Sequence, residues 1–190
     1  MTLLPFDAVL LAGGSGRRLG GADKPALEVA GLSLLDRAMA AVVGAGRVVV
    51  VGPRRELPAG VVQVREDPPG GGPGSALVAG LPLVSASAVV VLAADLPSIS
   101  AAVVDALRAA ADGHDGALLV DDDGVDQVLT AVWSTSALRA ALDGHDLTDR
   151  PLRPLLRSLD VVRVQAADAG VPGWADCDTP EDLARARSTA

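Results

Sequence analysis

Residues 9–24, with the sequence VLLAGGSGRRLGGADK, place five glycines, two arginines and a lysine directly after an apolar run. An ordinary strand-to-helix turn needs about one glycine for a positive φ angle, so most of these glycines must serve another purpose. The first three allow backbone N–H groups to approach a polyphosphate closely, while Arg17 or Arg18 together with Lys24 supplies positive charge. The stretch therefore predicts a phosphate-binding loop; the alternative is a glycine-rich surface turn with incidental cations.

Two well-known phosphate loops do not match this stretch. A Rossmann fingerprint that begins at Gly14 requires a third glycine where the chain has Leu19. A P-loop built on Gly16 and Gly21 lacks the lysine and the hydroxyl residue that must follow its last glycine. The loop therefore belongs to another class of phosphate-binding loop.

A second chemical feature is the single carboxylate of Asp95, which follows the apolar run VVVLAA (89–94). A charge there is costly unless it lies at the solvated end of the strand beside a cation. Mg²⁺ held by one or two carboxylates and by substrate phosphates meets that requirement, so Asp95 is a candidate magnesium ligand. Its other interpretation is a helix cap, although Ser98 or Ser100 could fill that role. If the metal-free protein leaves Asp95 unpaired, Asp95→Asn should melt at or slightly above the parent temperature.

The order of the predicted elements explains how these groups would meet. Short β-branched runs alternate with Ala/Leu-rich stretches, and unbroken apolar strands are typical of a parallel sheet covered on both faces. The sequence thus predicts an α/β fold, a three-layer α/β/α sandwich with a mostly parallel sheet. The phosphate loop would lie at the carboxyl end of the first strand, where such sheets bind ligands. Expected strands are 7–12, 47–52, 61–66, 88–94, two within 116–134, and 161–165; expected helices are 32–43, 75–84, 101–111, 135–142, 150–159 and 179–188.

The composition narrows the class of protein. The chain has 190 residues, 49% of them hydrophobic, which is enough for one continuous core and one domain. Its net charge of −8 and its three aromatic residues argue against binding to nucleic acid or to an anionic membrane surface. Cys177 is the single cysteine, the N-terminus has no basic n-region, and no apolar run reaches about 18 residues. We therefore expect a cytoplasmic protein without disulfides or a membrane span.

The loop sequence LAGGSGRRLGGADK resembles the LAGGxSxRMGxDK signature of the molybdenum cofactor guanylyltransferases, the MobA branch of the nucleotidyltransferases with a Rossmann-like fold. It differs at Gly16, where the family usually has a small residue such as serine, and at Leu19, where the family has methionine. The related cytidylyltransferases typically have alanine in place of Gly14, so this glycine favours guanine as the base. Later landmarks follow in the expected order, and the resemblance covers nearly the whole chain.

One such landmark, REDPPGGGPGSALVAGL (65–81), is similar to the family's D…GPLAGL segment. The resemblance places Asp67 and the Gly72-Pro73 turn near the guanine, whose N1–H and N2–H groups an acidic side chain can both accept. Without the resemblance, Asp67 is interpreted as a solvated carboxylate at the end of a strand.

Three further segments provide the metal ligands and the acceptor contact that the resemblance implies. The sequence around Asp95 resembles the family's metal-binding CDxP motif, and WADCDTPEDLARAR (174–187) its NxNTPEDL ending, with Asp176 and Asp178 in place of asparagines. The resemblance suggests that Arg150 binds the acceptor's phosphate; the alternative is a solvated basic face on a helix over 150–159.

Taken together, the resemblance implies the following site. Catalytic charge comes from Arg18, Lys24 and Asp95; nucleotide contacts come from Leu11, Ala12, Gly13, Gly14, Lys24, Asp67, Gly72, Pro73 and Asp95; metal ligands are drawn from Asp95, Asp176 and Asp178; and Arg150 contacts the acceptor. Within the single domain, residues 1–100 would form the nucleotide-binding half and residues 101–190 the acceptor-binding half.

The implied reaction is transfer of GMP from GTP to the phosphate of molybdopterin or the molybdenum cofactor, with Mg²⁺ as cofactor and with proteins of the molybdenum pathway as further partners. An ionised phosphomonoester needs no protein nucleophile, in keeping with the absence of an obvious triad. Two alternatives remain at this point. The chain could use CTP or another phosphorylated acceptor, or it could be a catalytically degenerate module that binds GTP without turning it over.

Overall fold

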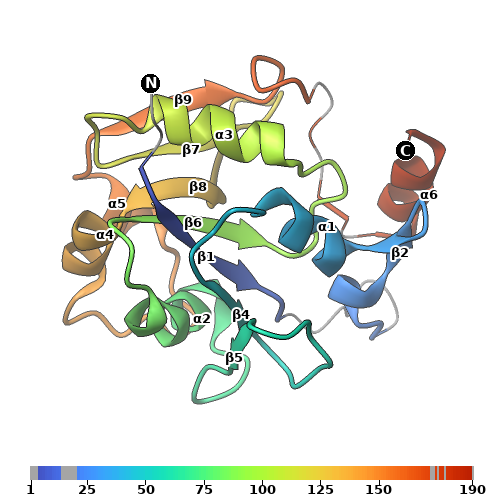
Figure 1. Cartoon of the computed structure of the whole chain (residues 1–190), viewed down its shortest axis with the longest axis horizontal. Helices are drawn as coiled ribbons and strands as arrows, with labels where there is room; N and C mark the ends of the chain where they lie inside the picture. Colours follow the sequence, from blue (N-terminus) through green and yellow to red (C-terminus); the bar gives the residue numbers. More distant parts are fainter. Residues whose placement is uncertain (1–3, 14–20, 172–173, 175, 178, 190) are drawn as a thin grey trace.

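The computed structural model describes residues 4–13, 21–171, 174, 176–177 and 179–189. Within these residues, seven strands form one sheet (Figure 1). Four of them run parallel, the fifth is antiparallel to its neighbours on both sides, and the last two are parallel to each other. The predicted α/β fold with a mostly parallel sheet is confirmed. In order across the sheet the strands are β5 (Val62–Val64), β4 (Val48–Val51), β1 (Phe6–Leu11), β6 (Ala88–Ala93), β8 (Asp126–Ser134), β7 (Gly116–Val120) and β9 (Val161–Gln165).

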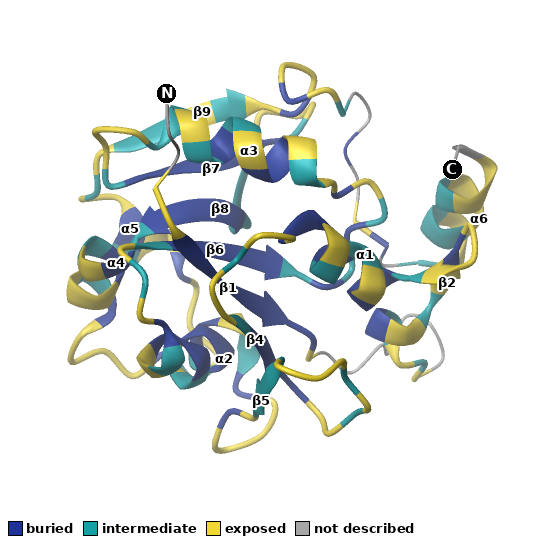
Figure 2. Ribbon diagram, in the orientation of Figure 1, coloured by how far each residue is buried: buried dark blue, intermediate teal, exposed yellow. Residues whose placement is uncertain are grey.

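Helices cover both faces of the sheet, because alternate strand residues point to opposite sides and both sets are apolar. Ala8 and Leu10 of β1 belong to the core beneath α1 (Leu34–Ala41) and α3 (Ala101–Ala110). Val9 and Leu11 belong to the core beneath α2 (Gly72–Gly80), α4 (Thr135–Leu142) and α5 (Arg153–Leu156). The central strands are accordingly buried along their length (Figure 2).

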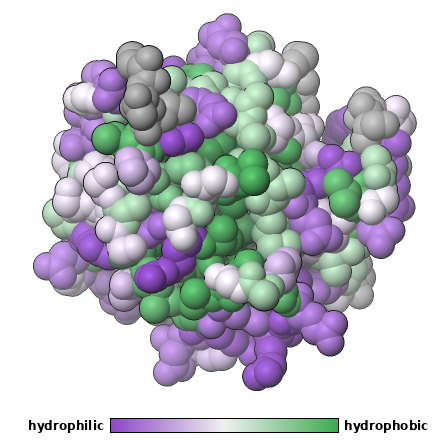
Figure 3. All heavy atoms as spheres, viewed as in Figure 1, coloured by the Kyte–Doolittle hydropathy of each residue, from purple (hydrophilic) through white to green (hydrophobic). Residues whose placement is uncertain are grey.

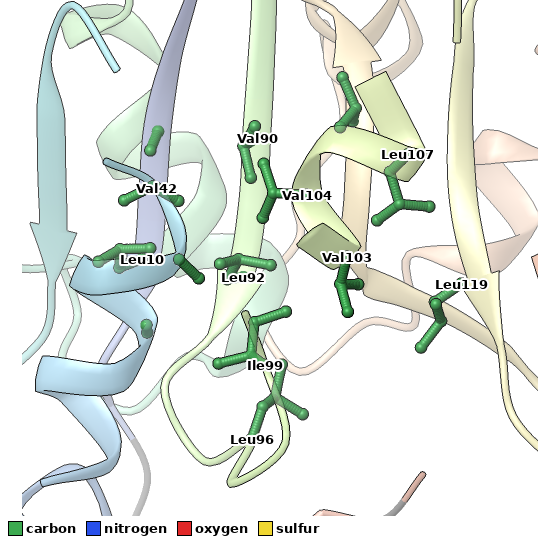
Figure 4. Close-up of a cluster of buried hydrophobic side chains, with 14 of the residues drawn as sticks. Leu10, Val42, Val90, Leu92, Leu96, Ile99, Val103, Val104, Leu107 and Leu119 are labelled. Atoms are coloured by element: carbon green, nitrogen blue, oxygen red, sulfur yellow. The ribbon is translucent and has the colours of Figure 1, made fainter. Parts of the chain in front are cut away.

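The first of these cores shows how tightly the layers are joined. Val103, Val104 and Leu107 of α3 point toward Leu92 and Leu119 of the sheet (Figure 4). Each fully buried side chain of this size contributes roughly 1.5–3 kcal/mol relative to exposure. In the space-filling view, apolar residues gather near the middle, with some hydrophilic residues among them, and hydrophilic residues are most frequent toward the edge (Figure 3).

Hydroxyl side chains cap the N-termini of four helices in the described part of the chain. Ser33, Ser100 and Ser134 each accept a hydrogen bond from the backbone N–H three residues later. Thr179 accepts from the N–H of Asp182 at 3.2 Å, and Asp182 accepts from the N–H of Thr179 at 2.9 Å, which is a reciprocal cap. These caps fix the residue at which each of the four helices begins.

Two predicted helices are shorter than expected. The helix expected over 32–43 begins only at Leu34, because Leu32–Ser33 forms strand β3, which pairs with β2 (Glu28–Val29). The helix expected over 150–159 reduces to α5, so the prediction that Arg150 lies along it is wrong. Pro151 disfavours helical geometry at the residue before it, and this explains the late start.

The C-terminal helix α6 (Pro180–Thr189) returns to the first part of the chain and lies beside β2 (Figure 1). Arg187 donates from Nε to the carbonyl of Glu28 at 2.9 Å, and Leu183 packs near the buried pair Val29 and Cys177. The chain's last segment is thereby brought to the residues that follow the glycine loop. None of the helices in the described ranges combines the length and the apolar character needed to cross a bilayer.

Candidate functional site

A cleft of about 470 Å³ opens at the carboxyl ends of β1 and β6. The chain leaves β1 toward β4 on one side and later returns to β6 on the other, so the two strand ends flank a reversal of strand order. Open α/β sheets bind ligands at such a point. Five residues assigned to nucleotide contacts from the sequence line the cleft: Leu11, Gly13, Gly72, Pro73 and Asp95.

Other residues of the cleft wall were not singled out from the sequence. Arg65 and Glu66 directly follow β5, and this charged pair at a strand's carboxyl end was an available signal. Leu129 comes from β8, and nothing local in the sequence marks it. The remaining wall residues are Pro53, Pro69, Gly70, Ala76 and Ala93. Flat apolar and proline surfaces beside a few polar groups suit a planar base.

Lys24 and Asp95 form an ion pair beside this cleft. The Nζ of Lys24 donates to Oδ2 of Asp95 at 2.8 Å, and the side chains are 13% and 26% exposed. The lysine begins a short 3-10 turn, η2 (Lys24–Ala26), whose Pro25 is buried and holds the turn in place. Two residues 71 positions apart, both predicted to act on phosphate, are thus in direct contact.

The second acidic segment reaches the same place from the C-terminus. The backbone N–H of Cys177 donates to the carbonyl oxygen of Asp95 at 3.0 Å, which brings the neighbouring Asp176 close to the strand end. Burial raises the pKa of the Cys177 thiol, and the carboxylate of Asp182 raises it further, so this cysteine stays a neutral core residue. Asp176 is exposed, and Asp178 lies outside the described residues.

The donor set fits a magnesium ion that relies on its substrate. Among the described residues there is no group of three or more His, Cys, Asp or Glu side chains that could enclose a metal. Mg²⁺ commonly takes one or two carboxylates and completes its shell with water and substrate phosphates. Asp95 lies at the cleft and pairs with a lysine, whose ammonium moves readily on its flexible stem, so it can offer such a carboxylate.

Of the neighbouring acidic residues Glu66 and Asp67, only Glu66 lines the cleft. Asp67 is exposed and is not among the wall residues, whereas Glu66 is only 8% exposed. Oε1 of Glu66 accepts the N–H of Gly70 at 3.0 Å, and Oε2 is buried without a hydrogen-bond partner among the described residues. A buried carboxylate oxygen that lacks a donor is costly, so this one is suited to a donor from a ligand.

The beginning of α2 also lines the cleft. Gly72 has φ of +84°, which a residue with a side chain rarely adopts, and Pro73 follows in the first turn. Backbone N–H groups at a helix start have no intrahelical acceptor and favour negative charge. This wall therefore adds to the attraction for an anionic ligand.

The remaining predicted residues are placed as follows. Ala12 is buried directly after β1. Arg150 is exposed and lines a separate hollow of about 190 Å³ with His145, Asp146 and Pro154, so it is not part of the cleft wall. Gly14 and Arg18 lie outside the described residues. Two other hollows, of about 240 and 520 Å³, contain neither a glycine loop nor a strand-end carboxylate among their described wall residues.

Comparison with known proteins adds a family. A family model described as the MobA-like NTP transferase domain matches residues 8–164. The molybdenum cofactor guanylyltransferase of Xanthomonas euvesicatoria pv. vesicatoria is 32% identical over 184 residues, which cover 95% of this chain and 94% of the relative.

Solved structures agree on the fold. Molybdopterin-guanine dinucleotide biosynthesis protein A from Archaeoglobus fulgidus superposes with a TM-score of 0.75 at 22% identity, covering 96% of this chain and 97% of that one. The 2-C-methyl-D-erythritol 4-phosphate cytidylyltransferase from Thermus thermophilus superposes with a TM-score of 0.72 at 21% identity, covering 99% and 98%. Because a cytidylyltransferase fits almost as well, the fold alone does not select the base.

Proposed function

Because this chain belongs to the MobA-like NTP transferase family, we propose that it transfers GMP from GTP to the phosphate of molybdopterin or the molybdenum cofactor. The observation that carries the proposal is the Lys24–Asp95 pair at the edge of a cleft whose walls come from β1, β6 and α2. At this place the cation can bind a negatively charged triphosphate, and the carboxylate can bind the divalent cation that accompanies it. Two parts of the proposal, the guanylyl group and the acceptor, are taken from the name of the relative that is 32% identical.

In the proposed reaction, a phosphate oxygen of the acceptor forms a new bond to the α-phosphorus of GTP. The bond between that phosphorus and the α–β bridging oxygen breaks, and pyrophosphate leaves with its electron pair. The acceptor is already ionised near pH 7, so no side chain has to remove a proton. The protein's task is to hold the two phosphates in line and to stabilise the charge that moves to the leaving group.

The chain's residues divide this task. Lys24 exchanges its carboxylate partner for phosphate oxygens, with Arg18 as a second cation, while the N–H groups at Gly13, Gly14 and the start of α2 contact the triphosphate. Asp95, joined by Asp176 or Asp178, would hold a Mg²⁺ ion. When bound, such an ion would supply positive charge that stabilises the charge developing on the phosphates.

The base and the acceptor occupy the two sides of this centre. We assign the guanine edge to the acidic pair Glu66 and Asp67, with Glu66 preferred because it stands in the cleft wall. Leu11, Ala12, Gly72 and Pro73 flank the base. We assign acceptor binding to residues 101–190, including Arg150, and nucleotide binding to residues 1–100. The proposal also includes action in the cytoplasm, with proteins of the molybdenum pathway as partners.

The deciding experiment incubates purified protein with molybdopterin, Mg²⁺ and either GTP or CTP, and follows pyrophosphate release and product mass. We expect the GMP adduct from GTP and little product from CTP. A larger CTP product would reassign the base. GTP binding without pyrophosphate release would instead identify a nucleotide-binding module without turnover, and product only with another phosphorylated acceptor would reassign the acceptor.

A further inference from the structure

Arg55, in the connection between β4 and β5, contacts both ends of the glycine loop. Its Nη2 donates to the carbonyl oxygen of Ala12 at 3.1 Å, where the chain leaves β1. The same guanidinium forms two bonds to the carboxylate of Asp23, at 3.1 and 3.2 Å, immediately before Lys24. One planar side chain thus joins the first and last residues of the segment that precedes the lysine.

The arginine is itself held firmly. Its side chain is 13% exposed, although Asp23 is 56% exposed. The backbone N–H of Arg55 donates to Oε1 of Gln63 at 3.3 Å, and Nε2 of Gln63 donates to the carbonyl of Pro53 at 2.6 Å. Because Gln63 belongs to β5, these bonds anchor the backbone that carries the guanidinium to the sheet, while the buried Nε of Arg55 has no hydrogen-bond partner among the described residues.

We propose that Arg55 is a positioning residue that fixes both ends of the glycine loop and so holds Lys24 against Asp95. The segment between the two contact points contains five glycines, and ordering glycine costs more backbone entropy than ordering any other residue. Because the clamp fixes both ends of the segment, part of this loss of entropy occurs on folding and not on ligand binding. The nature of the ligand, a nucleoside triphosphate, rests on the proposed function; the clamp itself does not.

This role predicts a particular kinetic signature. Without the clamp, nucleotide binding has to bring Ala12 and Asp23, with the adjacent Lys24, into position, so the affinity falls, while the saturated complex keeps its geometry. Arg55→Gln should therefore raise KM and Kd for GTP about tenfold and leave kcat within about twofold. Arg55→Lys should recover part of the loss, because an ammonium keeps the charge but cannot contact Ala12 and Asp23 as a fork does.

The matched control is Arg54→Gln, which removes the same charge from an exposed neighbouring residue. Asp23→Asn, at the exposed end of the clamp, should reproduce part of the effect of Arg55→Gln, and the double variant should lose less than the product of the two single losses. This second route keeps the test valid if Arg55→Gln folds poorly. Melting temperatures of all variants identify that case.

A measurement without nucleotide separates the clamp from the proposed function. Trypsin can cut after Arg17 and Arg18 inside the clamped segment, and the fragments are identified by mass. We expect cleavage there to be several times faster in Arg55→Gln than in Arg54→Gln. Equal cleavage rates and equal KM values in the two variants would overturn the proposal, as would a fall in kcat with KM unchanged. A cleavage difference in a protein that makes no GMP adduct would retain the clamp and reject the proposed function.

Discussion

Lys24 and Asp95 form a close pair of opposite charges beside the cleft. The two opposite charges lie 2.8 Å apart on side chains that are 13% and 26% exposed, so they attract each other directly. A triphosphate offers the lysine a denser negative charge than one carboxylate does, and a divalent ion offers the carboxylate a denser positive charge. In the proposed function, the pair balances the two charges before binding and separates into two ligand contacts afterwards.

Asp95→Asn should separate catalysis from binding. The amide keeps the shape of the side chain but not the charge that anchors a metal, so we expect kcat to fall about a hundredfold or more with a much smaller change in GTP affinity. Steady-state kinetics in Mg²⁺ and calorimetry with GTP measure the two quantities. Near-parental turnover would move the principal ligand to Asp176 or Asp178.

The same variant corrects a sequence-based expectation about stability. Asp95 is paired with Lys24, so its neutralisation relieves no repulsion and instead leaves a lysine that is 13% exposed without this partner. We now expect Asp95→Asn to melt slightly below the parent protein. Asp105→Asn, at an exposed ion pair within α3, is the control and should melt within about a degree or two of the parent.

The proposed role of Glu66 in base selection can be tested by measuring how a substitution changes the preference for GTP over XTP. Guanine presents two donors, N1–H and N2–H, whereas xanthine presents one donor and one carbonyl acceptor in their place. Glu66→Gln replaces a carboxylate by one acceptor and one donor, so the preference for GTP over XTP should fall at least about tenfold. Competitive binding of the two nucleotides measures it. Asp67→Asn is the matched control; if that variant alone changes the preference, Asp67 reads the base.

Among the elements, the ends of β1 and β4 approach each other more closely than any side chain would allow. A Cβ on Gly52 would lie 2.6 Å from the carbonyl oxygen of Ala12 and 3.0 Å from the backbone N of Gly13. Gly52 has φ of +153° and donates its N–H to the carbonyl of Val64 at 2.9 Å, so the glycine cannot move away without breaking the ladder to β5. The entry to the glycine loop depends on this contact.

Gly52→Ala should consequently disturb both stability and nucleotide binding. We expect a loss of about 2–4 kcal/mol in the free energy of unfolding, because backbone atoms and not flexible side chains must move. KM for GTP should rise as well. Gly60→Ala provides the comparison: its φ is +91° but its Cβ would meet no described atom within 4 Å, so it should cost only about 1–2 kcal/mol and leave KM unchanged. Equal effects of the two variants would contradict this account.

For the molecule as a whole, a buried carboxylate ties the central strand to the connection that leads into β6. Asp7 is 2% exposed, and its Oδ2 accepts from the N–H of Ser85 at 2.6 Å, the N–H of Ala86 at 2.9 Å and the hydroxyl of Ser85 at 3.1 Å. Burial by itself would raise the pKa of Asp7, but these hydrogen bonds outweigh it and lower the pKa. The folded state therefore favours the ionised carboxyl.

A lowered folded-state pKa gives stability that is complete above the unfolded pKa, about 3.9, and is lost as the pH falls through the folded value. Asp7→Asn should cost about 1–3 kcal/mol near pH 7, since it weakens charge-assisted bonds to three donors. Denaturant unfolding at pH 7 and at successively lower pH measures the difference, which should shrink below about pH 4. A difference that stays constant with pH would show that the carboxylate's charge contributes nothing.

The sequence by itself determined the features that depend only on residues adjacent in the chain. Glycine content and adjacent cations marked the loop, an apolar run before Asp95 marked a strand end, and alternating β-branched and Ala/Leu-rich stretches marked the layers, because backbone freedom and periodicity are local properties. Pro151 is a local feature too, and it accounts for the late start of the helix predicted over 150–159, which is shortened to α5. Only the tertiary structure decided that Glu66 and not Asp67 stands in the cleft wall and that Arg55 joins Ala12 to Asp23. It also decided that Cys177 brings the C-terminal segment to Asp95, since contacts between residues far apart in the chain follow from how strands order in the sheet, which no single segment encodes.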